Sequence, residues 1–309
     1  KFLIKWVYVI LLVSAIIQVY EVTLGGWLAP LGKAKVLEEF QGRSIEISGR
    51  EVAYIWNRAV TYSYLGLFLA LGTWITGNPQ GLSSRKQILL ISSGVVAFIL
   101  TMVRSWYIMI VVGIIVILLF GYRRKKKLFS IILIGIILLV LFNTFWSFGI
   151  DNEVDILNRL TSRFSTILDV FNGKTLHFTT RMLLLEQQLE FFLKRPIFGY
   201  GYSKSISLYS SDIGLGNTLL RFGLVGLAWI LLLLYSFYSN TKYLLKKLPQ
   251  SLEKGYILGM VGAWTGMVIG YSFSWDFFTS KEGIFLVTLM LAFVDRINIL
   301  FNKNINHSI

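Results

Sequence analysis

The sequence predicts an all-α, polytopic membrane protein with about eight transmembrane helices, and three observations support this fold class. Hydrophobic residues make up 55% of the 309-residue chain, charged residues only 15%, and the mean hydropathy is +0.66. Soluble domains carry about 25% charged residues. Apolar runs of helical length recur along the chain, and lysine and arginine gather in alternate connecting segments. These features exclude a soluble enzyme, a disordered chain and a fibrous protein.

The predicted spans are apolar stretches long enough, or nearly so, to cross about 30 Å of hydrocarbon as helices. Their polarity is continuous and does not alternate, which excludes a transmembrane β-barrel. Only Arg104 separates the third span from the fourth, so a tight helical hairpin with this arginine at its tip is predicted. The spans are residues 3–20, 59–77, 87–103, 105–121, 128–148, 213–236, 255–274 and 283–300.

The distribution of lysine and arginine predicts an N-terminus inside the cell. With that orientation the inner segments have a charge of +13, and the rest of the chain has +1 of the total +14. The basic run at residues 123–127 is therefore a cytoplasmic loop, and no nucleic-acid partner is expected. The inner segments are residues 1–5, 78–86, 121–128, 237–255 and the C-terminal tail.

Two long segments fall outside the membrane, residues 21–58 and 149–212, within one transmembrane domain that covers residues 1–309. The chain begins at Lys1, so we expect that spans before it are missing. The segment 149–212 is a large helical loop, because apolar residues recur in it at helical spacing. These residues are Leu157, Leu160, Phe164, Leu168 and Phe171.

A second helix is predicted later in the same loop. Thr179 and Thr180 are the expected cap, and the helix carries Arg181 to about Leu193. Pro196 ends it, and Gly199 and Gly201 begin a flexible stretch.

Charges at a span or at its mouth are costly, and they mark candidate site residues. Arg104 either snorkels to the interface or binds an anion, for which guanidinium is well suited. Arg181 either pairs with Glu186 on the surface or belongs to the same anion site. Asp212 suits an N-cap of the sixth span and also a catalytic role. Arg221 either pairs inside the bundle or lines a polar cavity.

Cofactor chemistry has little support in the residue inventory. The chain has no cysteine and only two histidines, His177 and His307. Neither histidine has a metal-ligand companion at helical spacing, so no metal and no cofactor is expected. A dinucleotide-binding loop and a Walker A motif are absent from the sequence.

Three segments together resemble the bacterial O-antigen polymerases and O-antigen ligases. Thr101-Met102-Val103-Arg104 is similar to the family's hairpin tip, T-x-S-R. The stretch from Arg181 to Gly201 is similar to its segment of an arginine, a helix and P-x-x-G-x-G. Residues 212–226 resemble its H-x10-G signature at the start of a span, with Asp212 and Gly223 at the required offset. The span order extends the resemblance to about residues 87–236.

Two positions differ from the family pattern. Val103 stands where serine is frequent, and Asp212 stands where ligases have histidine. The second difference favours a polymerase over a ligase and leaves the general base open. The family usually has ten or more spans, which again suggests that spans at the N-terminus are missing.

The resemblance implies a metal-independent glycosyltransferase with GT-C-like architecture in the bacterial cytoplasmic membrane, its active site facing outward. Its donor and acceptor would be glycans linked to undecaprenyl pyrophosphate, with membrane lipid and a chain-length regulator as further partners. Arg104 and Arg181 would stabilise the pyrophosphate that leaves, and Asp212 would accept the proton of the acceptor hydroxyl or orient the nucleophile. Arg195, Lys204 and Arg221 would contribute to substrate binding.

Three other functions fit the sequence less well. A ligase would transfer finished polymer to a lipid A-core or another acceptor. A transporter or flippase of lipid-linked glycan would show repeated halves, broken helices and ionisable residues on several spans, and no repeat is visible. A membrane scaffold without catalytic activity is the third.

Overall fold

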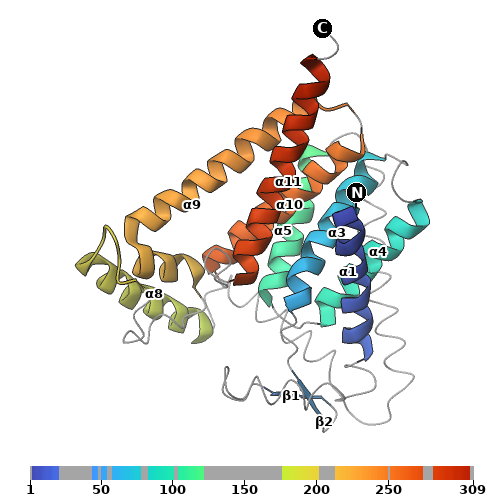
Figure 1. Ribbon diagram of the computed structural model, residues 1–309. Helices are drawn as coiled ribbons and strands as arrows, with labels where there is room; N and C mark the ends of the chain where they lie inside the picture. Colours follow the sequence, from blue (N-terminus) through green and yellow to red (C-terminus); the bar gives the residue numbers. More distant parts are fainter. Residues whose placement is uncertain are drawn as a thin grey trace.

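The computed structural model describes mainly helices, and most of them lie where apolar runs predict spans (Figure 1). Seven predicted spans coincide with helices, and the predicted span 128–148 and the amphipathic segment 157–171 lie outside the described residues. The helices at the predicted spans are α1 (Phe2–Tyr20), α3 (Arg58–Thr76), α4 (Ser84–Leu100), α5 (Arg104–Phe120), α9 (Gly214–Lys247), α10 (Leu252–Phe273) and α11 (Lys281–Asn306). The described residues are 2–20, 44–47, 50–53, 58–77, 83–100, 104–121, 176–201, 213–249, 251–273 and 281–306.

A β-hairpin in the first long loop corrects the all-α prediction. β1 (Ser44–Ile47) and β2 (Arg50–Ala53) pair antiparallel, with Ile45 opposite Val52 and Ile47 opposite Arg50. β-Branched side chains favour strands, and the sequence between the two strands is Ser48-Gly49, a turn signal. The hairpin was not predicted, because its two strands have only four residues each and contain no long apolar run.

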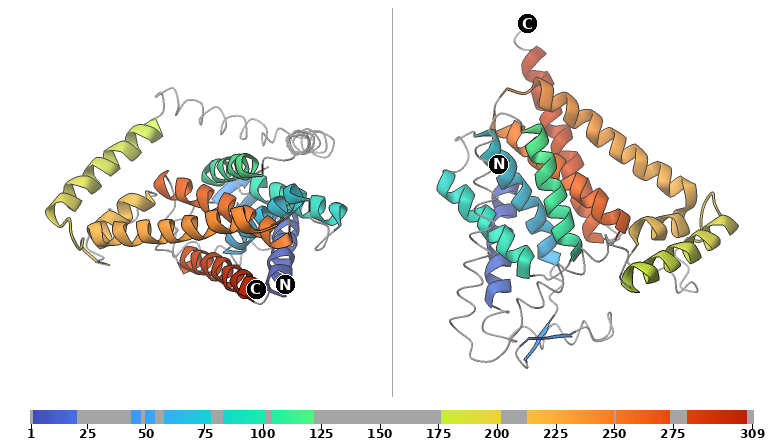
Figure 2. Two further views of the ribbon diagram at one scale, coloured as in Figure 1. Left: turned by 90° about the horizontal axis from the view of Figure 1, so that it is seen from above. Right: turned by 180° about the vertical axis from the view of Figure 1, so that it is seen from behind.

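The helices of the spans alternate in direction, so the ends rich in lysine and arginine gather on one side. α1, α4 and α10 run one way, and α3, α5, α9 and α11 run the other way (Figures 1 and 2). The start of α4 carries Arg85 and Lys86, and the last turn of α9 carries Lys246 and Lys247. These basic ends lie at the upper side in Figure 1, opposite the β-hairpin.

Helix α10 packs between α3 and α5 through a row of glycines on one face. Gly255, Gly259, Gly262, Gly266 and Gly270 recur at intervals of three and four residues, which places them on one face of the helix. A Cβ atom at any of these five positions would overlap the backbone or side chains of α3 or α5. Small residues at such an interface let two backbones approach closely, which is how helices associate where no water drives the packing.

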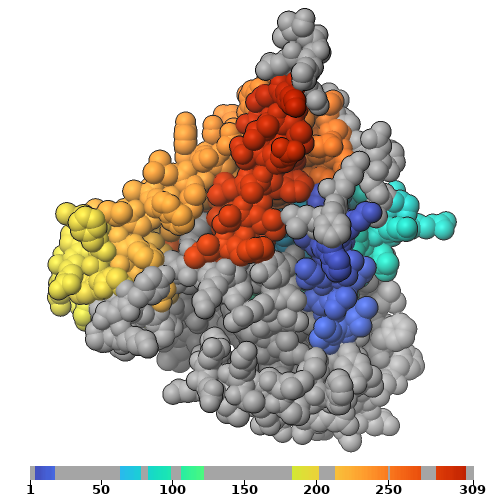
Figure 3. Space-filling model, in the orientation of Figure 1, coloured from blue at the N-terminus to red at the C-terminus, as the bar shows by residue number. Residues whose placement is uncertain are grey.

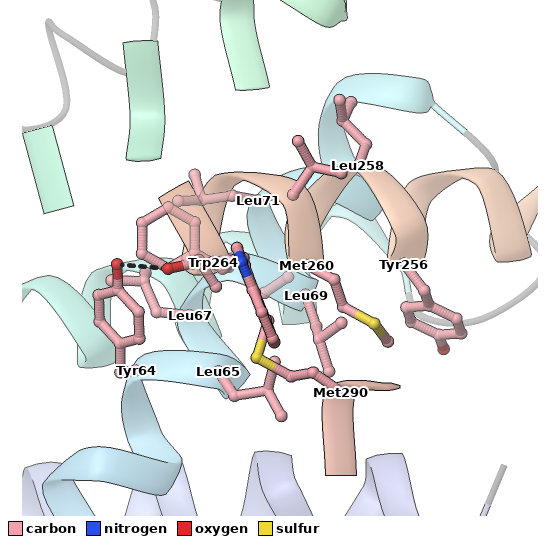
Figure 4. Close-up of a cluster of buried hydrophobic side chains, with 14 of the residues drawn as sticks. Tyr64, Leu65, Leu67, Leu69, Leu71, Tyr256, Leu258, Met260, Trp264 and Met290 are labelled. Atoms are coloured by element: carbon pink, nitrogen blue, oxygen red, sulfur yellow. Dashed lines mark hydrogen bonds between the residues drawn. The ribbon is translucent and has the colours of Figure 1, made fainter. Parts of the chain in front are cut away.

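Aromatic side chains complete the core around α10 (Figure 4). Trp264 is fully buried, and its ring stacks on Phe237 of α9 with 4.1 Å between ring centroids. The hydroxyl of the buried Tyr64 on α3 donates a hydrogen bond to the Ala263 carbonyl of α10 (3.1 Å). Buried tyrosine and tryptophan rings contribute a large apolar area, and the hydroxyl of Tyr64 is satisfied by a backbone carbonyl. These contacts hold α3, α9 and α10 in one unit.

The outer surface of the helices is strongly apolar. Within the described residues, Gly214–Lys247 and Gly283–Lys303 are long and apolar enough to cross a membrane, and Ile4–Ile17, Ser63–Thr76 and Trp106–Phe120 are shorter apolar helices. Large apolar side chains are exposed on α1, α4, α5, α8, α9 and α11, and the surfaces of α1, α9 and α11 are seen in Figure 3. Contiguous apolar surface of this extent would be a liability in water and is suited to lipid. Examples are Trp6, Val13, Leu119, Trp229, Leu232, Phe285 and Ile299.

Candidate functional site

The candidate site is built on α8 (Leu176–Lys194), the turn that follows it, and the first part of α9. α8 begins at Leu176, so Thr179 and Thr180 lie inside the helix and the prediction that they cap it was wrong. The predicted end is confirmed, since α8 stops at Lys194, just before Pro196. α8 lies beside the first part of α9, away from the other helices (Figures 1 and 2).

Helix α9 is broken at Gly223, which the sequence analysis did not predict. Gly223 has φ +60° and ψ −152°, a backbone conformation that is essentially restricted to glycine. The break separates residues 214–222 from residues 224–247. It interrupts the helical hydrogen bonds, so the carbonyls of Leu220 and Arg221 and the amides of Leu224 and Val225 lose their usual partners.

The turn at residues 195–201 supplies all four missing partners. The amides of Tyr200 and Gly201 donate to the carbonyls of Leu220 (2.7 Å) and Arg221 (2.8 Å). The amides of Leu224 and Val225 donate to the carbonyls of Pro196 (2.8 Å) and Ile197 (3.2 Å). Two hydrogen bonds within the helix are thereby exchanged for four hydrogen bonds between the helix and the turn. The stretch predicted to be flexible is an ordered part of the fold up to Gly201.

Glycines permit this close approach. A Cβ atom at Gly199 would lie 2.5 Å from the Leu220 carbonyl oxygen, and one at Gly223 would lie 2.5 Å from that of Pro196. Gly199 also has a positive φ of +66°. Gly199 of the predicted P-x-x-G-x-G motif and Gly223 of the predicted H-x10-G motif therefore each let the backbone of the opposite segment approach closely.

Buried polar contacts fix residues 214–222 to both neighbouring helices. The side-chain amide of Gln188 on α8 donates to the Asn217 side-chain oxygen (3.1 Å), and both residues are buried. The hydroxyls of Thr218 and Tyr271 are hydrogen-bonded, which joins the same segment to α10. Buried polar groups of this kind specify one arrangement, because any displacement leaves them without their partners.

The contacts also set the relative direction of α8 and the first part of α9. Gln188 contacts Asn217, and eight residues later Pro196 contacts Leu224, so the two segments run parallel. Arg181 lies seven residues, about two helical turns, before Gln188. Because the two segments run parallel, position 181 of α8 and the start of α9 lie towards the same end of this helix pair.

The predicted site residues differ in how far the structure describes them. Arg104 is the first residue of α5, as the predicted hairpin tip requires, and Arg181 lies in α8. The side chains of both, and the whole of Asp212 and Lys204, lie outside what is described. Ile213 occupies the N-cap position of α9, without a side-chain cap, so the prediction that Asp212 holds that position was wrong.

Two further predicted residues lie at the turn itself. Arg195 is exposed, and its guanidinium lies 5.0 Å from the centre of the Tyr200 ring, a cation–π distance. Tyr200 in turn donates from its hydroxyl to the Phe191 carbonyl of α8 (3.1 Å). Arg221 is half-buried in the first part of α9, and its carbonyl receives the Gly201 amide. The turn thus brings Arg195 and Arg221 into one region.

The sequence analysis missed the residues that shape this region. Gln188, Asn217 and Gly223 were not candidates, although Gln188 and Asn217 are polar residues on otherwise apolar helical faces, which is a signal for a buried polar pair. Gly223 appeared only as a motif position. Within the described residues, no three histidine, cysteine or acidic side chains group together as metal ligands would.

The fold and its exposed apolar helices are compatible with a helical membrane protein. Residues 87–230 match the family model described as O-antigen ligase, which confirms the resemblance to the O-antigen ligase and polymerase family over that stretch. The match covers just under half of the chain and includes all six predicted site residues. No curated protein and no solved structure matches the chain.

Proposed function

We propose that this protein polymerises oligosaccharide repeat units linked to undecaprenyl pyrophosphate, at the outer face of the bacterial cytoplasmic membrane. One observation carries the proposal. The 195–201 turn and the break of α9 fit together through four backbone hydrogen bonds, and both lie in the segment that matches the family model. Two of the three motifs that carry the family resemblance thus form one structural unit.

The proposed site uses Arg181 and Asp212 on adjacent segments of that unit. Support comes from the parallel direction of α8 and the first part of α9. Asp212 lies outside the described residues, and in the sequence it directly precedes Ile213, which is buried. Arg104 begins α5 on the same side of the molecule as the β-hairpin, the side opposite the basic helix ends (Figure 1).

In the proposed reaction, a hydroxyl of the acceptor glycan attacks the anomeric carbon of the donor glycan. The bond from that carbon to the pyrophosphate oxygen breaks, and undecaprenyl pyrophosphate leaves with an added negative charge. Arg104 and Arg181 stabilise this charge in place of a metal ion. Asp212 accepts the proton of the attacking hydroxyl and later returns it to water. Arg195, Lys204 and Arg221 bind the substrate's polar groups.

The test is polymer formation by purified variants in membranes supplied with the lipid-linked repeat unit alone. Arg181→Ala should lower the rate by at least about 100-fold, the usual effect of losing one group that stabilises developing charge. Glu186→Ala on the same helix is the matched control and should retain the wild-type rate. The same control tests the alternative in which Arg181 only forms a surface ion pair with Glu186. In that case Arg181→Ala and Glu186→Ala would change the rate equally.

The result that would overturn the site assignment is a normal ladder of polymer lengths from Arg181→Ala. Arg104→Ala and Asp212→Asn should show the same loss as Arg181→Ala, while each variant still elutes as a folded protein. Normal polymer from either of these two variants would separate that residue from the proposed site.

A ligase is the second candidate, because the family model that matches is described as O-antigen ligase. The two activities differ in their substrates. A polymerase makes a ladder from repeat units alone, whereas a ligase makes product only when a finished polymer meets a separate acceptor. Supplying the repeat units with and without such an acceptor therefore separates the two.

A further inference from the structure

The surface at the end of α8 and just after it carries an unusual combination of side chains. Leu193, Ile197 and Phe198 expose 71%, 57% and 75% of their surface. Lys194 and Arg195 lie between them and are also exposed. We call residues 193–198 the apolar tip. It projects beside α9 at the left edge of the molecule in Figures 1 and 3, away from α1, α3, α4 and α5.

The hydrogen bonds of the turn fix the height of the apolar tip relative to the long part of α9. Pro196 and Ile197 accept from Leu224 and Val225, the first residues after the break. Leu224 lies 18 residues before Lys242, about 27 Å along a helix, which is close to the thickness of the hydrocarbon core. If Lys242 lies at the inner interface, Leu224 and the apolar tip lie at the outer one. Figure 1 shows the turn level with the break in α9.

The apolar surface continues from the tip onto the lipid-facing side of α9. Leu224 and Val225 expose about half of their surface, and Trp229, Leu231 and Leu232 follow them. No acidic residue occurs from Leu193 to Gly201, whereas Glu186 and Glu190 lie earlier on the exposed face of α8. The charge on this face therefore changes from negative to positive towards the tip.

We propose that the apolar tip inserts into the extracytoplasmic leaflet of the membrane and anchors α8 there. Ile197 and Phe198 enter the edge of the hydrocarbon, and Lys194 and Arg195 contact lipid phosphates. Apolar side chains flanked by cations bind membranes in this way, through buried area and attraction to anionic headgroups. The long stems of Lys194 and Arg195 suit the boundary, because their charged ends reach the headgroups while the stems stay in apolar surroundings.

The anchor has a consequence for α8 whichever sugar chemistry the protein performs. α8 carries Arg181 and is joined to the tip without interruption. Anchoring one end of the helix holds it beside the leaflet that contains any lipid-linked substrate. The proposal itself depends only on α9 spanning the membrane, so it stands or falls separately from the proposed reaction.

The test uses the natural absence of cysteine, which allows single-cysteine variants of the full chain. Phe198→Cys and Ile197→Cys are labelled with an environment-sensitive fluorophore, and the protein is placed in lipid nanodiscs. Glu186→Cys, also exposed on α8, is the matched control. Quenching is measured with iodide in the water and with spin-labelled lipids that carry the label near the headgroup.

We expect the labels at positions 197 and 198 to be quenched by the lipid label and to be at least about fivefold less sensitive to iodide than the label at 186. Equal iodide sensitivity at all three positions would overturn the proposal, because the tip would then face water. Protection from iodide without lipid quenching would also overturn it, because protein and not lipid would cover the tip.

The cations are tested separately in nanodiscs of neutral and of anionic lipid. In the Phe198→Cys background, anionic lipid should increase lipid quenching, and the additional changes Lys194→Gln and Arg195→Gln should remove that increase. An increase of the same size without the two cations would overturn their assignment to lipid phosphates.

Discussion

Gly199, Gly201 and Gly223 all have a positive φ, but only two of them are closely surrounded. Gly199 and Gly223 touch the backbone of the opposite segment, whereas a Cβ atom at Gly201 would have no neighbour within 4 Å. The three positions therefore separate two effects of a glycine, its backbone conformation and the space it leaves. Only at positions 199 and 223 is glycine required both for the positive φ and for the close approach of the opposite backbone.

Gly223→Ala should release the turn from α9. Alanine in this conformation costs about 1–3 kcal/mol, and a continuous helix would restore the two bonds from Leu224 to Leu220 and from Val225 to Arg221. We expect hydrogen exchange at the amides of Tyr200 and Gly201 to accelerate by about tenfold, since 1.4 kcal/mol corresponds to a factor of ten. Exchange mass spectrometry on residues 195–201 measures this.

Gly201→Asn is the control for Gly223→Ala. Asparagine tolerates a positive φ, and position 201 has open space around it. Exchange in the turn should change by less than about threefold. Equal protection of the turn in Gly223→Ala and in the wild type would contradict the role given to Gly223.

At the level of the elements, the sequence predicted what depends on local composition. Apolar runs marked the helices of the spans, and Pro196 marked the end of α8. The start of α8 at Leu176 and the break at Gly223 were not predicted, since neither has a strong local signal. The break in particular is stabilised by a turn more than 20 residues earlier in the chain. No window around Gly223 contains the residues that hold it.

The glycine face of α10 should tolerate substitution poorly. A Cβ atom at Gly259 would overlap the Phe68 carbonyl of α3 and lie 3.0 Å from the Leu69 Cα. Gly259→Leu should therefore destabilise the fold by at least about 1–3 kcal/mol through overpacking. Leu232→Ala on the exposed side of α9 should cost less than about 0.5 kcal/mol. Unfolding in detergent compares the two, and equal costs would contradict this packing.

For the whole molecule, the uneven distribution of lysine and arginine along the sequence predicted that the basic helix ends lie on one side. The basic ends of α4, α9 and α11 gather on one side, although they are far apart in the sequence. The candidate site was predicted less completely. The family motifs pointed to the correct segments, but the way in which the turn fits the broken helix depends on backbone geometry that side-chain patterns do not encode.

The orientation can be checked with two single-cysteine variants of the cysteine-free chain. Both Glu186 and Lys247 are exposed, at opposite ends of the unit formed by α8 and α9. A maleimide that cannot cross membranes should label Glu186→Cys in intact spheroplasts and Lys247→Cys only after permeabilisation, because lysine-rich segments stay inside. Labelling of Lys247→Cys in intact cells would reverse the predicted topology.

The four hydrogen bonds between the turn and α9 have a consequence for how this region can evolve. All of them join backbone groups, so they place a demand on Pro196, Gly199 and Gly223 and almost none on the side chains between them. Exposed residues such as Ile197 and Phe198 can therefore be exchanged to suit a different lipid without changing the four backbone hydrogen bonds. The backbone joint and the exposed side chains of the turn can therefore change independently.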